Sequence, residues 1–256
     1  MEKHTIIQPP QTHQPAYVAN GFVGLRVGMN PFLGQTALLS GFTGSHERFG
    51  VEAYAPIPAV QYNLMMDGSS LQKNPDGYQL IEQTYDFSCG ELSTSFAFSN
   101  SRGQKLLGTS LIYCSRSCPS AVIQETQLEV MQECELRFST LMETTKLPIK
   151  TRLTVVPNVD CDGVLWIESR DGSTTAGIST YLQCEGEAEF REVNTDWGYE
   201  QERLSKTYSV QAVPGKSYRY RMMTSYIPGT LHSEPHWQAV RMIKLAQCKG
   251  FHKLRE

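Results

Sequence analysis

The sequence predicts an all-β protein that ends in one helix, and three observations support this fold class. Short apolar runs recur at intervals of roughly ten to fifteen residues with Gly, Pro, Asn and Asp between them, as in a sandwich or barrel. Strands and helices do not alternate along the chain, which disfavours an α/β fold. Only residues 236–249 carry apolar side chains at helical spacing. A chain of 256 residues that is 40% hydrophobic is long enough to build one large core.

The chain divides into three parts on this pattern. Residues 1–16 contain three prolines and show no period, so they are predicted to form an extended or partly disordered lead. Residues 17–231 are predicted to form a single β-sandwich domain. Residues 232–256 are predicted to form a helical segment that follows it.

Turn chemistry separates the predicted strands. Asn20-Gly21, Asp67-Gly68 and Pro214-Gly215 are pairs that favour tight turns. The last pair is predicted to join residues 201–213 and 216–225 in a hairpin.

One strand, residues 121–130, alternates most clearly. Its even-numbered residues are predicted to face the core. Its odd-numbered residues, Ile123, Glu125, Gln127 and Glu129, are predicted to face solvent.

The closing helix has its own start and stop signals. Trp237, Val240 and Ile243 form an apolar stripe at helical spacing. Ser233 is the predicted N-cap, and Gly250 is a fitting residue after the last turn.

Charge and cysteine content exclude several classes of function. The net charge is −3 and the sequence has no basic stretch, so it shows no sign of binding to nucleic acid or to an anionic membrane. No apolar run is long enough to span a bilayer, and no signal peptide is visible at the amino end. The seven cysteines are odd in number and irregularly spaced, which favours free, mostly buried thiols. Such thiols suit a reducing compartment, so a cytoplasmic location is favoured over a periplasmic or secreted one.

The stretch from Tyr17 to Gly28 contains the most informative motif. Asn20 and Gly21 form a turn, and Gly24 leaves room for a neighbouring strand or side chain. Arg26 lies inside an apolar run, so its guanidinium is expected to form a buried or interfacial ion pair. All of these are interpreted as structural roles.

This motif, residues 20–26, resembles the "NGYLGxR" signature near the amino end of glycoside hydrolase family 65. The family contains maltose, trehalose and kojibiose phosphorylases and related disaccharide hydrolases. Further stretches resemble its motifs in the family's order: residues 41–44, 55–60, 64–68 and 85–92. The last of these lacks the two arginines of the family's "LDLRRGVL" pattern.

The resemblance implies a fold and a function. The fold would be a large two-sheet super-sandwich of the galactose-mutarotase-like type, with residues 232–256 as a linker helix toward an (α/α)6 catalytic barrel. The catalytic acid of the family lies in that barrel, so no catalytic residue, metal ligand or cofactor is expected within this chain. The expected partners are the barrel itself and an α-linked disaccharide or glucoside at the domain interface, and a homodimer is left open.

Two loops are candidates for sugar contact. In the first, Phe42 supplies a ring that can stack on a sugar, while His46 and Arg48 supply hydrogen-bonding groups. In the second, Trp197 and Tyr199 form an aromatic motif. The competing interpretation is that both are ordinary surface loops packed on the sandwich.

Two other functions remain open on the sequence. A stand-alone carbohydrate-binding module would show exposed aromatic side chains on one sheet face and would bind sugar in isolation. A small enzyme of the aldose-epimerase type would need a His and a Glu facing each other on a concave surface. The carboxylates at positions 185, 187, 189 and 192 are interpreted as a solvated charged face.

Overall fold

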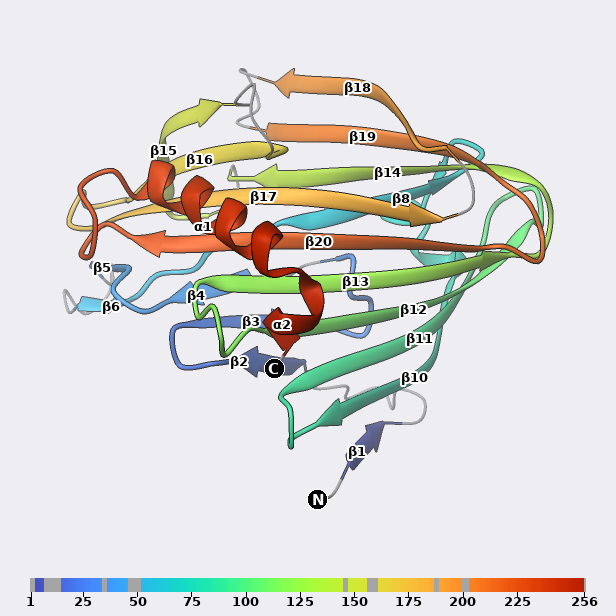
Figure 1. Cartoon of the computed structure of the whole chain (residues 1–256), viewed down its shortest axis with the longest axis horizontal. Helices are drawn as coiled ribbons and strands as arrows, with labels where there is room; N and C mark the ends of the chain where they lie inside the picture. Colours follow the sequence, from blue (N-terminus) through green and yellow to red (C-terminus); the bar gives the residue numbers. More distant parts are fainter. Residues whose placement is uncertain are drawn as a thin grey trace.

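The computed structural model describes residues 3–6, 15–33, 36–45, 52–144, 147–155, 161–186, 189–198 and 203–255. The chain is 58% strand and 11% helix, which confirms the predicted all-β class. The strands form two layers, and the helices lie on the outer face of one layer (Figure 1).

The larger layer is one antiparallel sheet that contains nine strands within the described residues. In spatial order they are β1 (Lys3–Ile6), β10 (Tyr78–Asp86), β11 (Glu91–Ser99), β12 (Lys105–Cys114), β13 (Ala121–Val130), β20 (Ser217–Pro228), β17 (Thr175–Gly186), β16 (Gly163–Ser169) and β15 (Ile149–Val155). Strand β20 enters between β13 and β17 and pairs with both. A strand from late in the chain therefore holds the two halves of the sheet together.

The second layer is divided into smaller antiparallel sheets. Five described strands form one of them: β18 (Arg191–Gly198), β19 (Arg203–Ala212), β14 (Cys134–Glu143), β8 (Gln61–Met66) and β9 (Ser69–Ser70). Four more form another: β2 (Ala16–Ala19), β3 (Val23–Val27), β4 (Thr36–Leu39) and β7 (Ile57–Pro58). A separate hairpin consists of β5 (Thr43–Ser45) and β6 (Glu52–Tyr54), and a short 3-10 helix spans Pro75–Gly77.

The core lies between the layers. Phe138 of β14 stacks on Tyr220 of β20, so rings from the two layers meet directly. The hydroxyl of Tyr62 on β8 donates to the carbonyl oxygen of Gln124 on β13 at 2.9 Å. The predicted two-sheet sandwich is thus confirmed, with its second layer split in two.

Helices α1 (Pro235–Lys249) and α2 (Phe251–Arg255) cover part of the outer face of the nine-stranded sheet (Figure 1). Ile243 and Leu254 are fully buried there in an apolar cluster that includes Ile123 and Met223 of the sheet. The prediction that Ile123 faces solvent is therefore wrong, because the end of the chain returns over this strand. Strand alternation cannot reveal a helix that is more than a hundred residues away in sequence.

The helix begins close to the sheet. An added Cβ on Gly177 of β17 would lie 2.1 Å from the carbonyl carbon of Pro235 and 2.2 Å from the amide nitrogen of His236. A glycine is therefore required for α1 to dock at this depth. The ring of His236 stacks on Trp166 of β16 with centroids 4.5 Å apart.

Two details of the helix prediction are corrected. The N-cap residue is Glu234 rather than Ser233, and no side chain caps the helix there. Trp237 is exposed and does not belong to the buried face of α1, which includes Val240 and Ile243. Gly250 ends the helix with a φ of 77°, as predicted.

The predicted hairpin at Pro214-Gly215 is also corrected. Gly215 makes the turn with a φ of 81°. However, β19 belongs to the five-stranded sheet and β20 to the nine-stranded sheet, so the chain crosses between layers at this turn. Turn residues show where a chain reverses, but they do not show whether the strands on either side pair with each other.

The amino end and the cysteines complete the fold. Residues 3–6 of the predicted lead form the edge strand β1 on β10.

All seven cysteines are free thiols, and only Cys89 and Cys248 are exposed. Burial raises the pKa of the Cys114 thiol to about 12, so this group is unreactive at neutral pH.

Candidate functional site

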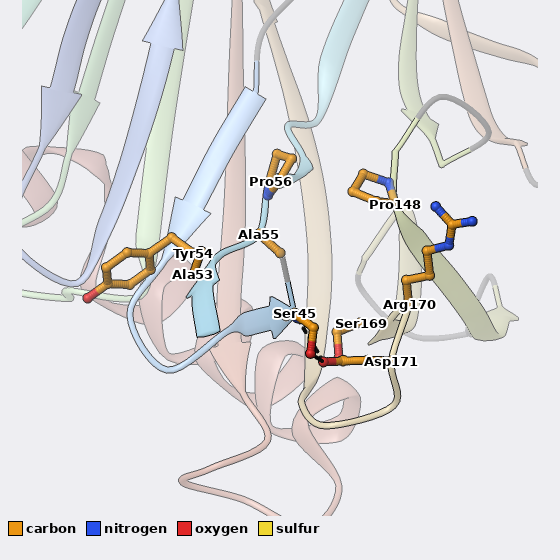
Figure 2. A pocket seen from close by; sticks show the side chains of 10 residues that line it. Ser45, Ala53, Tyr54, Ala55, Pro56, Pro148, Ser169, Arg170 and Asp171 are labelled. Atoms are coloured by element: carbon orange, nitrogen blue, oxygen red, sulfur yellow. Dashed lines mark hydrogen bonds between the residues drawn. The ribbon is translucent and has the colours of Figure 1, made fainter. Parts of the chain in front are cut away.

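A pocket of about 470 Å³ opens between the β5–β6 hairpin and the turn that joins β16 to β17. Its size falls within the range of small-molecule sites in proteins. Figure 2 shows the residues around it: Ala55 and Pro56 form one side, Pro148 and Arg170 the opposite side, and Ser45 and Asp171 close the base. The lining is thus apolar on one wall and polar at the base.

Asp171 organises the base of the pocket. Its Oδ2 accepts hydrogen bonds from the amide and the hydroxyl of Ser45, each at 2.8 Å. Its Oδ1 accepts from the hydroxyl of Ser169 at 2.7 Å, and from the hydroxyl and the amide of Ser173 at 2.8 and 3.1 Å. The carboxylate therefore joins the hairpin to a turn that is 126 residues away in sequence.

This arrangement fixes the protonation state of Asp171. The hydrogen bond from Ser169, followed by those from Ser45 and Ser173, holds the pKa of the Asp171 carboxyl well below its usual range. The group stays ionised at any physiological pH, and its oxygen atoms are already occupied. It is thus suited to anchoring the hairpin and unsuited to donating a proton to a leaving group.

A second set of hydrogen bonds fastens the same hairpin. The amide of Thr43 donates to the hydroxyl of Thr174 at 3.1 Å, and that hydroxyl donates back to the carbonyl oxygen of Thr43. Strand β5 is therefore held by side-chain hydrogen bonds at both of its ends, Thr43 and Ser45.

A shallower groove lies beyond the hairpin. It has a volume of about 180 Å³ and is lined by Gly21, Gly24, Leu38 and Tyr54 among others. Tyr54 borders both hollows, is 64% exposed, and in Figure 2 directs its ring away from the Ser45–Asp171 contact.

The first predicted sugar-contact loop leads into the pocket, and the structure describes only its first residues. Phe42 is fully buried in the core and offers no ring face to a ligand in this structure. His46 and Arg48 lie outside the described residues. Among the described residues of this loop, Gly44 and Ser45 line the pocket, and neither was predicted.

The second predicted loop is in part a strand. The backbone of Trp197 belongs to β18, whereas Tyr199 lies outside the described residues. Their contact with sugar remains a proposal.

The motif at residues 20–26 forms the β2–β3 hairpin. Oδ1 of Asn20 accepts from the amides of Phe22 and Val23, each at 3.0 Å, and Gly21 has a φ of 88°. Nδ2 of Asn20 donates to the carbonyl oxygens of Ser115 and Pro119, at 2.7 and 2.9 Å. Asn20 thus fastens this turn to the loop after β12, which is a structural role.

Gly24 and Arg26 of the same motif differ in how their predicted structural roles compare with the structure. Gly24 lies opposite Ala19, and an added Cβ would come within 3.3 Å of the Cβ of Ala19. Arg26 is exposed on the outer face of β3, which excludes the buried ion pair, whereas the interfacial ion pair stays a prediction. The apolar run that suggested burial belongs to the opposite, inward face of the same strand.

A buried carboxyl lies elsewhere, between the two layers. Asp162 accepts from the hydroxyl of Tyr208 at 2.9 Å and pairs with the ammonium of Lys206 at 3.1 Å. Burial raises the pKa of the Asp162 carboxyl, and Lys206 and Tyr208 lower it in part. Because Asp162 is only 2% exposed, a substrate has no access to it, and the group links β19 to the edge of the large sheet.

Some of the carboxylates that were predicted to form a solvated charged face form ion pairs. Glu185 binds Arg221 at 2.6 Å and Glu192 pairs with Lys206 at 3.3 Å, while Glu189 is exposed. Glu187 lies outside the described residues. Among the described residues, no cluster of three or more His, Cys, Asp or Glu side chains is arranged to hold a metal ion. No helix in the described part of the chain combines the length and apolar character needed to cross a membrane.

The sequence contains only a partial signal for the pocket. Asp171-Gly172 is a recognisable turn pair, and Gly172 has a φ of 78°. Nothing in the sequence shows that this turn meets Ser45, because the contact depends on how the two layers stack.

The fold has a relative among solved structures. A putative kojibiose phosphorylase from the human microbiome matches with a TM-score of 0.71 and 12% identity, over 93% of this chain and 34% of that chain. This chain therefore spans about a third of that protein's length. A heparinase III matches with a TM-score of 0.38 and 9% identity, over 84% of this chain and 36% of its own, which is too weak to bear on the fold. No model of a known protein family matches the sequence. A search of curated proteins found no relative.

Proposed function

We propose that this chain is the amino-terminal β-sandwich of a larger protein of glycoside hydrolase family 65, which acts on α-glucosides. The observation that supports it most is the fold shared with a kojibiose phosphorylase over 93% of this chain. The ordered resemblance of residues 20–26 and four later stretches to the family's motifs points the same way, and it does not depend on the fold comparison. Fold alone does not determine function, so both are needed.

The chemistry of the described residues supports a non-catalytic role. A glycosidase needs two carboxyl groups across the scissile bond, one of which must be protonated. The pocket base holds Asp171, which is ionised and saturated with hydrogen bonds. Asp162 has a raised pKa but is closed off from solvent. Neither is placed to act as the acid.

In this proposal the sandwich supports an (α/α)6 catalytic barrel and shapes the entrance to its active site. Residues 17–231 are the supporting domain, and residues 232–256 lead toward the barrel. His46, Arg48, Trp197 and Tyr199 remain proposed contacts for an α-linked disaccharide at the boundary between the domains.

A turnover assay tests the proposal. The purified chain is incubated with kojibiose, trehalose, nigerose and maltose, each with and without inorganic phosphate, and released glucose and glucosyl phosphate are measured. An active kojibiose phosphorylase is the positive control. No turnover above background is expected. Turnover by this chain at a rate near that of the control would contradict a supporting role.

A further inference from the structure

We propose that the attachment of the first turn of α1, residues 235–238, to the sheet is controlled by pH. Protonation of His236 detaches this turn from β16 and β17, while the rest of the helix stays in place. The proposal is independent of the supporting role above, because it concerns how the end of the chain is fastened to the sandwich. It rests on the burial of the His236 ring, on the groups around it and on its place in the helix.

The ring of His236 is enclosed where the helix first meets the sheet. The side chain is 3% exposed. Its ring stacks on Trp166 of β16, with the centroids 4.5 Å apart and the ring planes 11° from parallel. Gly177 of β17, which pairs with Trp166, leaves room for the backbone of Pro235 and His236. The imidazole therefore packs directly on the sheet as part of the contact that begins α1.

This environment accommodates a neutral imidazole better than a charged one. Among the described residues, Nδ1 of His236 is buried without a hydrogen-bond partner, and so is Nε1 of Trp166. Protonation places an N–H group on both nitrogens of the imidazole, so the buried Nδ1 of His236 would carry a donor that has no acceptor. Burial accordingly lowers the pKa of His236.

The position of His236 in the helix acts in the same direction. It is the second residue of α1, and no side chain caps this end of the helix. The first backbone N–H groups of a helix have no partner within the helix, and they place the positive end of the helix dipole there. A cation at this position is therefore disfavoured by the helix as well as by burial.

Two nearby groups favour the charged ring, and neither outweighs its burial. The carboxylate of Glu234, just before the helix, raises the pKa of His236 by less than burial lowers it. The face of the Trp166 ring attracts cations, but the guanidinium of Arg152 already lies 5.3 Å from its centre. Arg152 is itself paired with Glu168.

The other strands under the helix add no charge at this level of the sheet. Strand β17 contributes Gly177, and β20 contributes Ile227, which pairs with Gly177. Further along the helix, the apolar cluster that includes Ile243 contains phenol and thiol groups, which are uncharged in acid. These belong to Tyr113, Cys118, Cys161 and Tyr181.

The rest of the helical segment is held independently of His236. Ile243 and Ala246 are fully buried on the sheet side of α1. Beyond the helix, both oxygens of the Glu91 carboxylate accept hydrogen bonds from the guanidinium of Arg255. Loss of the His236 contact is therefore expected to open the first turn alone, because local opening reaches only as far as the next well-packed contacts.

The direction of the pH dependence follows from the lowered pKa. The folded chain holds its proton on His236 less tightly than the unfolded chain does. The contact is thus complete above about pH 6.5, the ordinary pKa of histidine, and is lost as the pH falls below it through the lowered value. Acid therefore releases the first turn, and neutral pH restores it.

Two NMR measurements on the 256-residue chain test the proposal. The first follows the imidazole C–H signals from about pH 8 to about pH 4, and the midpoint of His236 should lie below the ordinary histidine value of about 6.5. The second measures amide hydrogen exchange, corrected for the intrinsic rate at each pH. The amide of Gln238, which donates to the carbonyl oxygen of Glu234, should lose protection severalfold between about pH 7 and about pH 5. The amide of Gly250, which donates to Ala246, should keep its protection.

Two variants assign the effect to one ring. His236→Phe keeps an aromatic ring against Trp166 but cannot take up a proton, so the pH dependence of Gln238 should disappear. His232→Phe removes an exposed histidine four residues earlier and is the matched control, which should keep the dependence. Circular dichroism and a thermal melt at neutral pH confirm that each variant is folded.

Four results would overturn the proposal. They are a His236 midpoint at or above about 6.5, equal protection of Gln238 at both pH values, a loss of protection that reaches Gly250 equally, and a pH dependence that His236→Phe retains. The first three are measured on the unaltered chain, so they do not depend on how the variant folds. None of them bears on the turnover assay.

Discussion

The C-terminal helices and the β5–β6 hairpin are both fastened to the sandwich, but by different forces. Helix α1 is held by apolar burial, with Ile243 and Ala246 fully buried and Gly177 allowing close approach. The hairpin is held mainly by hydrogen bonds around Asp171 and Thr174. The helix interface also contains the buried His236, whose pKa is lowered by burial, so its protonation at low pH weakens that contact. The hairpin contact depends on the charge of the Asp171 carboxylate. The comparison therefore predicts that core substitutions weaken the helix contact most and that loss of one carboxylate weakens the hairpin contact most.

The largest expected effect comes from the helix interface. Ile243→Ala removes a fully buried side chain and is expected to lower the free energy of unfolding by about 3 kcal/mol. Leu245→Ala on the same helix, where the side chain is 47% exposed, is expected to cost less than about 1 kcal/mol. Urea unfolding at pH 7 measures both. Equal effects would show that α1 does not pack on the sheet as described.

A second substitution tests the close approach of the helix to β17. Gly177→Ala places a methyl group against the backbone of Pro235 and His236, and the resulting overpacking is expected to cost about 2 kcal/mol. Gly28→Ala is the matched control, because an added Cβ there meets nothing within 4 Å. Chemical unfolding of the two variants should differ clearly. A Gly177→Ala protein as stable as Gly28→Ala would rule out this contact.

The smallest global effect, and the most local one, is expected at the hairpin. Asp171→Asn removes the charge that Ser45 and Ser173 bind, so the Ser45 amide should exchange with solvent about tenfold faster while global stability changes little. The folded-state pKa of Asp171 is lowered, so its stabilising contribution is present above about pH 4 and is lost as the pH falls further. Hydrogen exchange followed by NMR from pH 7 to pH 2 measures this. A pH dependence that persists in Asp171→Asn would exclude Asp171 as the anchor.

The sequence predicts the strands well and their assignment to layers poorly. Alternation and turn pairs such as Asp67-Gly68 are local properties, and the strands they predict are present. Whether β19 and β20 pair, or whether a helix covers Ile123, depends on contacts between distant segments. The same limit applies to the pocket, because the contact between Ser45 and Asp171 arises only when the layers stack.

Arg26 shows a related limit of pattern reading. Its neighbours Leu25 and Val27 are buried, and a run of such residues suggests a buried arginine. In a strand, however, alternate residues face opposite sides, and Arg26 takes the solvent side. The period of the strand, and not the local hydrophobicity, decides the environment of its guanidinium.

The most direct test of the proposed function is to isolate the native protein from its source with an antibody raised against this chain. Its mass and its action on α-linked disaccharides are then measured. A polypeptide much larger than 28.8 kDa that releases glucose or glucosyl phosphate is expected. A native protein of 28.8 kDa that carries out such a reaction unaided would contradict the proposal.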